Sequence, residues 1–311
     1  MTQLALGTTP AQRSTPLRRL IGLADRWSGL LMVGPALVLY LIMLVVPVFL
    51  AGYLSLTDWD GYSANPAFLG LANYLHLIGN PEVLRAGAVT LLIALVGTLL
   101  LNGCGLGLAL LVGKASRLNS FFRMVLFYPH VLSALVVGFL WSAILGSSGV
   151  VNSFLTQQGA QVLPFLARPG WAVGTMIAVL VWSGFGVNLV LYIAGLQTVS
   201  SDLIEAARID GAGRGQVFRQ VTFPALAPVV TINLVLCLVT LLKTYDLVVS
   251  LTAGGPAGAT QTAAYLILSE SFHNSELGLG SAQSVVLMVI TGVLALSVAR
   301  LRARADAGVR A

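Results

Sequence analysis

The sequence predicts an all-α membrane protein with six transmembrane helices and both termini in the cytoplasm. Three features support this prediction: the composition, six long apolar stretches and the distribution of the basic residues. Of the 311 residues, 57% are apolar and 9% are charged, and the mean hydropathy is +0.90. A soluble domain carries roughly a quarter charged residues, so this composition cannot cover a surface that faces water. The bilayer is therefore the expected solvent.

The composition also excludes three other classes of protein. Intrinsic disorder needs low hydrophobicity and high net charge, a disulfide scaffold needs many cysteines, and nucleic-acid binding needs a clustered basic face. The two cysteines, Cys104 and Cys237, lie in apolar stretches, where a thiol behaves as a small hydrophobe. We expect neither a metal site nor a nucleic-acid partner.

The six apolar stretches are each close to or above the roughly 20 residues that are needed to cross a hydrocarbon core. In chain order they are Leu30–Leu54, Gly87–Val112, Met124–Leu145, Trp171–Leu196, Leu226–Leu251 and Ala282–Ala299. Of the 17 basic and 11 acidic residues, only Lys243 and Asp246 fall within these limits. The first stretch is expected to be a retained helix, because its uncharged run of residues 27–57 is longer than the roughly 7–15 residues of a signal-peptide core.

The basic residues predict the direction in which the spans run, because short loops rich in Lys and Arg stay in the cytoplasm. The two tails and the second and fourth loops hold 14 of them, whereas the alternate loops hold only Arg85 and Arg168. We therefore predict a cytoplasmic N-terminal tail over residues 1–29, a six-helix membrane domain over residues 30–299 and a cytoplasmic C-terminal tail over residues 300–311. Within the second span, Gly103 and Gly107 are expected to mark a helix-packing face.

The fourth loop, residues 200–225, has the pattern of a short helix. Asp202 is a candidate N-cap, with Glu205 three residues later completing a capping box. Gly211 can end the helix in the left-handed conformation. Pro224 is expected to redirect the chain into the fifth span, because proline suits only the first turn of a helix. Taken as a capping pattern alone, these residues also fit an ordinary solvated loop.

The whole loop, however, resembles the cytoplasmic signature loop of permease subunits of bacterial binding-protein-dependent ABC importers. Phe223 is a small departure, since Leu is frequent there in the family. The resemblance implies a type I ABC importer permease fold. It also implies that this loop couples the chain to an ATPase subunit, through Glu205, Ala206, Ala207, Asp210, Gly211, Gly213, Phe218 and Pro224.

A second stretch resembles the end of the fifth helix and the following outer loop of sugar-type permeases. It comprises residues 243–246 together with Gly254, Gly255 and Pro256. It is most similar to the permease that pairs with a second, different permease, as in maltose and glycerol-3-phosphate importers. Tyr245 stands where Phe is more usual.

Polar residues within the spans are candidates for the substrate pathway. Asn188 and Tyr192 are one helical turn apart in the fourth span, and Asn233 and Thr240 lie in the fifth. A hydroxyl-rich ligand needs such hydrogen-bonding partners in a concave site, although the same side chains can simply hold helices together.

The charged residues of the fifth span leave the same two interpretations open. Lys243 and Asp246 are three residues apart, so in a continuous helix they would share a face and could pair. They form either a structural ion pair or, with Tyr245, part of the substrate pathway, since ionisable groups at membrane depth usually face a protein interior or a wet cavity.

Three other functions are less favoured. The stretch from Gly107 to Ala115 misses the phosphate-binding loop pattern in spacing and in its last residue, so the chain itself is not expected to bind ATP. The run of residues 146–149, Gly-Ser-Ser-Gly, resembles part of a rhomboid intramembrane protease, but no histidine base lies in the sixth span. A secondary transporter driven by an ion gradient would need acids within the spans, and Asp246 is the only one.

The resemblance therefore implies a non-enzymatic permease subunit, without a cofactor of its own, in the bacterial cytoplasmic membrane. A second permease, two ATP-binding cassette subunits and an extracytoplasmic solute-binding protein would be its partners. The substrate it implies is a carbohydrate or a related solute.

Overall fold

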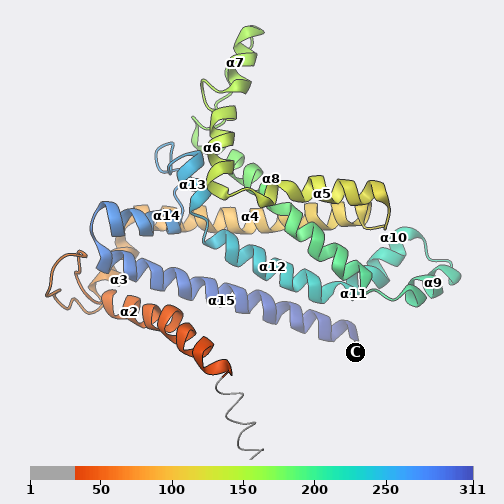
Figure 1. Cartoon of the computed structure of the whole chain (residues 1–311), viewed down its shortest axis with the longest axis horizontal. Helices are drawn as coiled ribbons and strands as arrows, with labels where there is room; N and C mark the ends of the chain where they lie inside the picture. The colour runs from red at the N-terminus through yellow and green to blue at the C-terminus, as the bar shows by residue number, and fades with distance from the viewer. Residues whose placement is uncertain (1–31, 311) are drawn as a thin grey trace, which may run out of the picture. The chain divides into compact units, whose positions relative to one another are not determined.

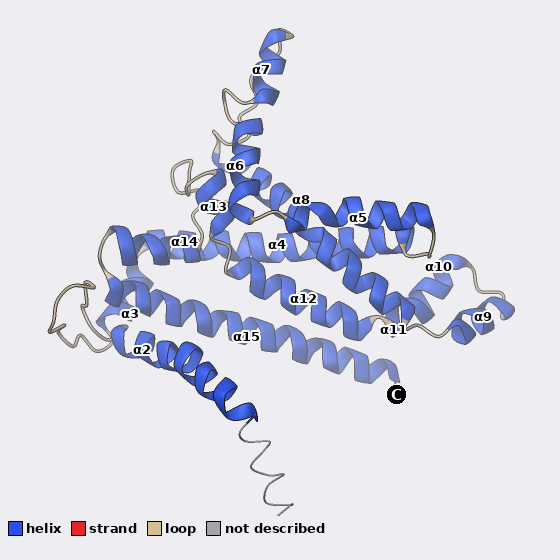
Figure 2. Cartoon of the chain, in the orientation of Figure 1, coloured by secondary structure: helices blue, strands red, loops and turns tan. Residues whose placement is uncertain are grey.

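The computed structural model describes residues 32–310 of the chain, and side chains as far as residue 302. The chain divides into two compact units, residues 1–53 and residues 54–311. Within the described part, helices and connecting loops make up the structure and no strand is present (Figures 1 and 2). The one β feature there is an isolated bridge between Thr57 and Phe68.

The described part of the first unit is a single helical run that begins at residue 32. A π-helical turn η1 (Leu41–Val45) continues into α2 (Val46–Leu54). The wide turn precedes Pro47, whose missing N–H would break the regular ladder. The predicted first span matches this run, and the predicted N-terminal tail lies outside the described residues.

The second unit begins with a loop and α3, and its long helices then follow one another to the C-terminal end (Figure 1). Its elements are α3 (Ala72–Gly79), α4 (Pro81–Val112), α5 (Arg117–Val131), α6 (Ala134–Leu145), α7 (Val150–Gln157), α8 (Pro169–Gln197), α9 (Ser201–Ile209), α10 (Arg214–Val217), η2 (Phe218–Thr222), α11 (Phe223–Ala225), α12 (Ala227–Leu242), α13 (Asp246–Leu251), α14 (Ala263–Leu268), η3 (Ser269–His273) and α15 (Leu277–Arg310).

Five helical segments of the described chain are long and apolar enough to cross a membrane, and a bent pair brings the number to six. The five are Met32–Leu54, Pro81–Val112, Ala134–Gln157, Pro169–Gln197 and Leu277–Arg302. The pair joins Arg214–Ala225 to Ala227–Leu242 at an angle of 67°. The first, second, fourth and sixth predicted spans thus have counterparts within a few residues of the predicted bounds.

The predicted third span, Met124–Leu145, is wrong as a continuous helix. The chain leaves the helical conformation at Leu132 and Ser133, where ψ is 140° in both residues. Pro129 in the last turn of α5 weakens that helix by removing a backbone donor. Beyond the break, α6 turns aside to pack on α13, and Gly138 lies so close to Ser250 that a Cβ would collide with it.

The predicted fifth span, Leu226–Leu251, is also interrupted. Helix α12 ends at Leu242, the chain is irregular over residues 243–245, and α13 begins at Asp246. The backbone carbonyl of Thr244, freed by this break, accepts a hydrogen bond from the Thr262 hydroxyl at 2.7 Å. A side chain from outside the span therefore stabilises the break, which hydropathy along the span could not reveal.

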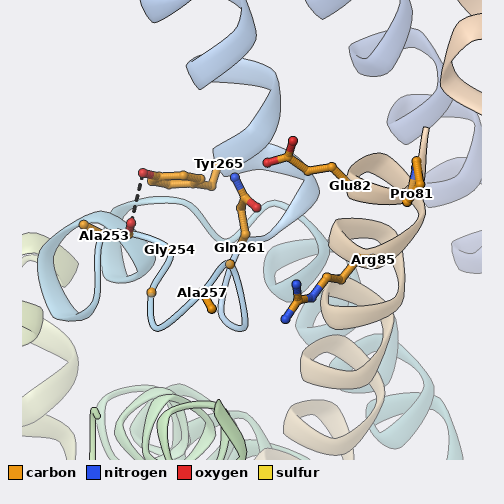
Figure 3. Close-up of a pocket in the computed structure, with 10 residues that line it drawn as sticks. Pro81, Glu82, Arg85, Ala253, Gly254, Ala257, Gln261 and Tyr265 are labelled. Atoms are coloured by element: carbon orange, nitrogen blue, oxygen red, sulfur yellow. Dashed lines mark hydrogen bonds between the residues drawn. The ribbon is translucent and has the colours of Figure 1, made fainter. Parts of the chain in front are cut away.

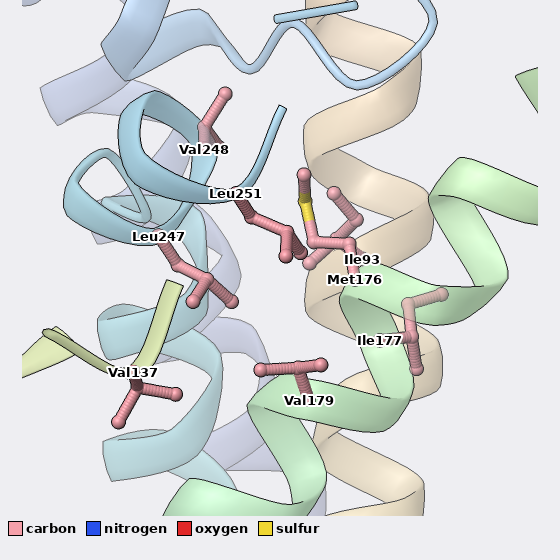
Figure 4. Packing of buried hydrophobic residues seen from close by; sticks show 8 residues of the cluster. All are labelled: Ile93, Val137, Met176, Ile177, Val179, Leu247, Val248 and Leu251. Atoms are coloured by element: carbon pink, nitrogen blue, oxygen red, sulfur yellow. The ribbon is translucent and has the colours of Figure 1, made fainter. Parts of the chain in front are cut away.

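The interior of the second unit forms where α4, α8, α12 and α13 meet. Figure 4 shows a cluster of buried apolar side chains contributed by α4, α6, α8 and α13. Its members are Ile93, Val137, Met176, Ile177, Val179, Leu247, Val248 and Leu251. Two further clusters continue along α12, one toward α4 and one toward α8. Because α4 and α8 contribute to this interior along their length, they form the frame on which the polar residues of the spans are placed.

Glycine decides how closely α4 and α8 approach. A Cβ at Gly105 would lie 2.5 Å from Asn188 Cβ and 3.0 Å from its carbonyl carbon. The expectation for Gly103 and Gly107 is wrong, because a Cβ at either position would meet no atom within 4 Å. Gly105 lies on the opposite side of the helix from these two residues, since successive residues are about 100° apart.

Candidate functional site

The loop between α8 and α12 presents a short helix on the surface of the second unit. Helix α9 buries none of its residues, and the side chains of Leu203 and Ile209 are 58% and 86% exposed. Its first turn is not capped as predicted: the N-cap is Ser200, no side chain accepts a hydrogen bond there, and Asp202 lies inside the first turn. The capping box of Asp202 and Glu205 is therefore wrong, because the helix starts one residue before Asp202 rather than after it.

The predicted end of this helix is confirmed. Gly211 has φ +84°, the left-handed conformation that glycine adopts without steric cost. The N–H of Gly211 donates to the carbonyl of Arg208 at 3.0 Å, and the N–H of Ala212 donates to that of Ala207 at 2.9 Å. This pair of bonds is a Schellman motif, which sets the direction in which the chain leaves α9.

The rest of the loop turns the chain into α12. The N–H of Gly213 donates to Gln216 Oε1 at 2.8 Å, so α10 begins at a defined point. The rings of Phe218 and Phe223 then pack 5.9 Å apart across η2. The 67° bend between α11 and α12 confirms the predicted redirection of the chain near Pro224. The residues that follow α9 therefore form an elbow that joins α9 to α12 and is held by these contacts.

A cavity of about 500 Å³, called the central cavity below, lies between α4, α8 and α12, at the break between α5 and α6. Three predicted pathway residues line it: Asn188, Asn233 and Thr240. Tyr192 does not line it. Its side chain is 1% exposed and its hydroxyl donates to Asn102 Oδ1 at 2.7 Å, so Tyr192 joins α8 to α4 behind the cavity wall.

Two amide side chains of the cavity lining are not fully hydrogen-bonded within the chain, which leaves them able to bind a ligand. Asn188 Oδ1 accepts from the Cys237 thiol at 3.1 Å, and Asn188 Nδ2 has only a 3.5 Å contact to the carbonyl of Gly184. The Asn233 side chain is 1% exposed, and its Nδ2 has no hydrogen-bond partner. An unpaired buried donor costs about 1–3 kcal/mol, which a hydroxyl or carbonyl oxygen in the cavity would recover.

Two polar lining residues were missed by the sequence analysis: Ser183 and His130. Ser183 could have been found, because it is a polar residue within the same apolar span as Asn188. His130 enters the cavity only because α5 ends at Val131, so no helical periodicity pointed to it.

The charged residues of the predicted fifth span lie at the break between α12 and α13. Lys243 is the C-cap of α12 and Asp246 begins α13, so they do not share a helical face as predicted. Both are exposed, and the structure places no ion pair between them. Neither residue, nor Tyr245, lines the cavity.

A second pocket, of about 480 Å³, lies between the start of α4 and the loop of residues 252–262 (Figure 3). Gly254 and Gly255 line it, as do Arg85 and Tyr265, whereas Pro256 does not. Figure 3 shows the Tyr265 ring lying over this loop, with its hydroxyl donating to the carbonyl of Ala253 at 3.0 Å.

Threonine hydroxyls form hydrogen bonds within the same loop. The hydroxyls of Thr252 and Thr260 are 2.7 Å apart, and that of Thr260 also donates to the carbonyl of Gly255. The predicted outer-loop residues thus form a compact, internally bonded turn.

Comparison with known proteins identifies the family. The model of the binding-protein-dependent transport system inner membrane component matches residues 102–311, which contain α9, its elbow and all of the central cavity lining except Leu101. The chain belongs to this family of permeases. A probable starch degradation products transport system permease, AmyD of Thermoanaerobacterium thermosulfurigenes, is 32% identical over 86% of this chain and 90% of its own length. The sn-glycerol-3-phosphate transport system permease UgpA of Brucella abortus is 32% identical over 87% and 92%.

A solved structure shares the fold of this permease. A crystal structure of a bacterial alginate ABC transporter, in complex with an alginate pentasaccharide-bound periplasmic protein, contains a chain with a TM-score of 0.79. That chain is 22% identical, and the match covers 92% of this permease and 97% of the other chain. The family and the fold support an ABC importer permease, which is a transport component, over both a rhomboid protease and an ion-gradient transporter.

Proposed function

We propose that this permease forms, together with a second permease, the translocation pathway of an ABC importer for a carbohydrate or related polyol. An extracytoplasmic binding protein delivers the substrate, and two ATP-binding subunits bind and hydrolyse ATP on the cytoplasmic side. The chain itself holds no ATP. The observation that carries the proposal is the central cavity, which amide and hydroxyl side chains from α8 and α12 line, among them Asn233 with an unpaired Nδ2.

The lining of the cavity supports a hydroxyl-rich substrate. Asn188, Asn233 and Thr240 supply donors and acceptors, and apolar side chains of α4, α8 and α12 fill the space between them. A neutral sugar needs this combination, since its hydroxyls form hydrogen bonds while its C–H faces pack on apolar groups. The similar permeases AmyD and UgpA carry names that refer to starch degradation products and sn-glycerol-3-phosphate, which are also polyhydroxylated.

Helix α9 supports the coupling role. It exposes Leu203 and Ile209, and both are apolar side chains that a partner surface could cover. The small side chains of Ala206 and Ala207 would let that surface approach the backbone closely. The Schellman motif and the elbow hold α9 rigidly relative to α12, so a displacement of α9 by an ATPase subunit would be transmitted to the helix that carries Asn233.

The test is uptake of labelled sugars and glycerol phosphates in cells that contain the complete importer. Asn233→Leu keeps the branched shape and the number of heavy atoms but removes the amide oxygen and nitrogen, and it should lower uptake at least tenfold at limiting substrate while the protein level stays normal. The matched control is Thr231→Val on the same helix, because the hydroxyl of Thr231 donates to the carbonyl of Ala227 and does not line the cavity. Parental uptake by Asn233→Leu across all substrates would overturn the assignment of the cavity.

A further inference from the structure

A third cavity, of about 570 Å³, lies between α3, α4, α14 and α15. Its lining is almost entirely aliphatic, and only Tyr74, Thr90 and Gln283 contribute polar side chains. It shares no lining residue with the central cavity. It therefore lies apart from the proposed substrate pathway.

Two of the three polar side chains are already satisfied. The Tyr74 hydroxyl lies 2.7 Å from Ser55 Oγ. The Thr90 hydroxyl donates to the carbonyl of Ala86 and accepts from the N–H of Ala263, both at 2.7 Å. These two groups serve the fold and need no ligand.

Gln283 is different. Its side chain is 6% exposed, and neither Nε2 nor Oε1 has a hydrogen-bond partner. A buried polar group without a partner is destabilising, and in a membrane there is little water to relieve it. Gln283 lines an apolar cavity, and an unpartnered amide at the edge of such a cavity fits a ligand with a long hydrocarbon part and a single hydrogen-bonding group.

The position of the cavity along the helices indicates which ligand this is. Helix α4 has 32 residues and is therefore about 48 Å long at 1.5 Å per residue. A hydrocarbon core of about 30 Å leaves about 9 Å of a centred helix beyond each face. Gly87 is six residues from the start of α4, and Gln283 is six residues from the start of α15, so both lie about 9 Å in. They are level with the boundary where acyl chains meet their ester groups.

We propose that this cavity binds an acyl chain of a membrane glycerolipid, whose ester carbonyl accepts a hydrogen bond from Gln283 Nε2. The lipid belongs to the leaflet at the end of α4 opposite the α9 loop, because α4 starts at that end and leads back toward α5. Bound in this way, it fills the space between α4 and α15 and gives Gln283 Nε2 a hydrogen-bond partner. The inference goes beyond the proposed function and does not depend on which solute is transported.

Two pairs of variants test the proposal in the assembled transporter, purified in mild detergent from native membranes. Gly87→Leu places a side chain into the cavity without a clash, because a Cβ there meets no atom within 4 Å. Gly103→Leu is the control, equally open on the same helix but away from the cavity. Gln283→Leu removes the amide. Thr291→Val is its control, because the Thr291 hydroxyl is also a buried and unpaired polar group of α15 but does not line the cavity.

Native mass spectrometry should find a retained glycerolipid in the parent and in both controls. Gln283→Leu should retain it roughly fivefold less, equivalent to about 1 kcal/mol at 25 °C, and Gly87→Leu should lose it. A phosphatidylethanolamine with a photoreactive acyl chain should label peptides of α4 and α15 in the parent, and should label them only weakly in Gly87→Leu. Equal lipid retention by all four variants would overturn the proposal. So would retention of a free fatty acid in place of a glycerolipid, or crosslinking of position 87 to residues 32–53 with no lipid adduct.

Discussion

The contact between α4 and α8 depends on the absence of one methyl group. At Gly105 a Cβ would lie 2.5 Å from Asn188 Cβ and 3.0 Å from the carbonyl carbon of the same residue. Carbon atoms in contact are normally about 3.5–4.0 Å apart. Gly105→Ala therefore forces the helices about 1 Å apart, and it does so beside Asn188, which lines the central cavity.

Gly103→Ala on the same helix isolates the effect of this contact. A Cβ at Gly103 meets no atom within 4 Å, so this variant receives only the gain of about 0.5–1 kcal/mol from replacing a helical glycine. Gly105→Ala receives the same gain but adds an overpacking cost of about 1–3 kcal/mol. The propensity terms cancel, so the free energies of unfolding of the two variants should differ by about 2 kcal/mol.

The assay is thermal unfolding of the purified transporter in nanodiscs, followed by sugar uptake in cells. With a shift of roughly 2–4 °C per kcal/mol, the Tm of Gly105→Ala should lie about 4–8 °C below that of Gly103→Ala. Uptake should fall only in Gly105→Ala, because the displaced Asn188 distorts the cavity. Equal Tm values for the two variants would refute the reasoning, since they would show that α4 and α8 do not meet at Gly105.

Three further predictions concern the ends and loops of the chain. Gly211→Val strains the left-handed position at φ +84° and should abolish stimulation of ATP hydrolysis by the loaded binding protein. The control Gly215→Val, at an open position with no left-handed φ, should retain most of this stimulation. Normal stimulation in Gly211→Val would contradict the coupling role. The pKa of Asp60 is lowered to about 2 because the backbone N–H groups of Ser63 and Tyr62 donate to its carboxylate. Its contribution to the order of this loop is therefore present above about pH 4 and lost as the pH falls to about 2. Protection of the Tyr62 and Ser63 amides, measured as the exchange rate relative to the intrinsic rate at the same pH, should fall only in that window in the parent and should be low at every pH in Asp60→Ala. Loss of protection already at pH 6 in the parent would count against the assignment. Reporter enzymes fused to the C-terminus should be active in the cytoplasm, and activity outside would refute the orientation inferred from the basic residues.

The sequence by itself determined the class of fold, the approximate position of most spans and the family. A bilayer leaves a spanning chain few options other than helices, so a run of apolar residues is sufficient evidence for a span. The end of α9 was equally predictable, because Gly211 occupies a conformation that depends on local sterics alone. The signature residues around it carried the family resemblance without any knowledge of the tertiary structure.

Only the tertiary structure decided where helices break and which polar residues meet. The predicted third and fifth spans run through Leu132 and Lys243 as continuous helices, whereas packing of α6 on α13 and the hydrogen bond from Thr262 favour the breaks. In the same way, Tyr192 faces Asn102 while Asn188 faces the cavity one turn away.

The glycines of α4 also show a contact that the sequence alone could not predict. Gly103 and Gly105 look alike in the sequence, but only Gly105 meets the backbone of α8. Which face of an almost uniformly apolar helix becomes buried is decided by the neighbouring helix against which it packs. That neighbour is distant in the chain and leaves no periodic signal within the helix itself.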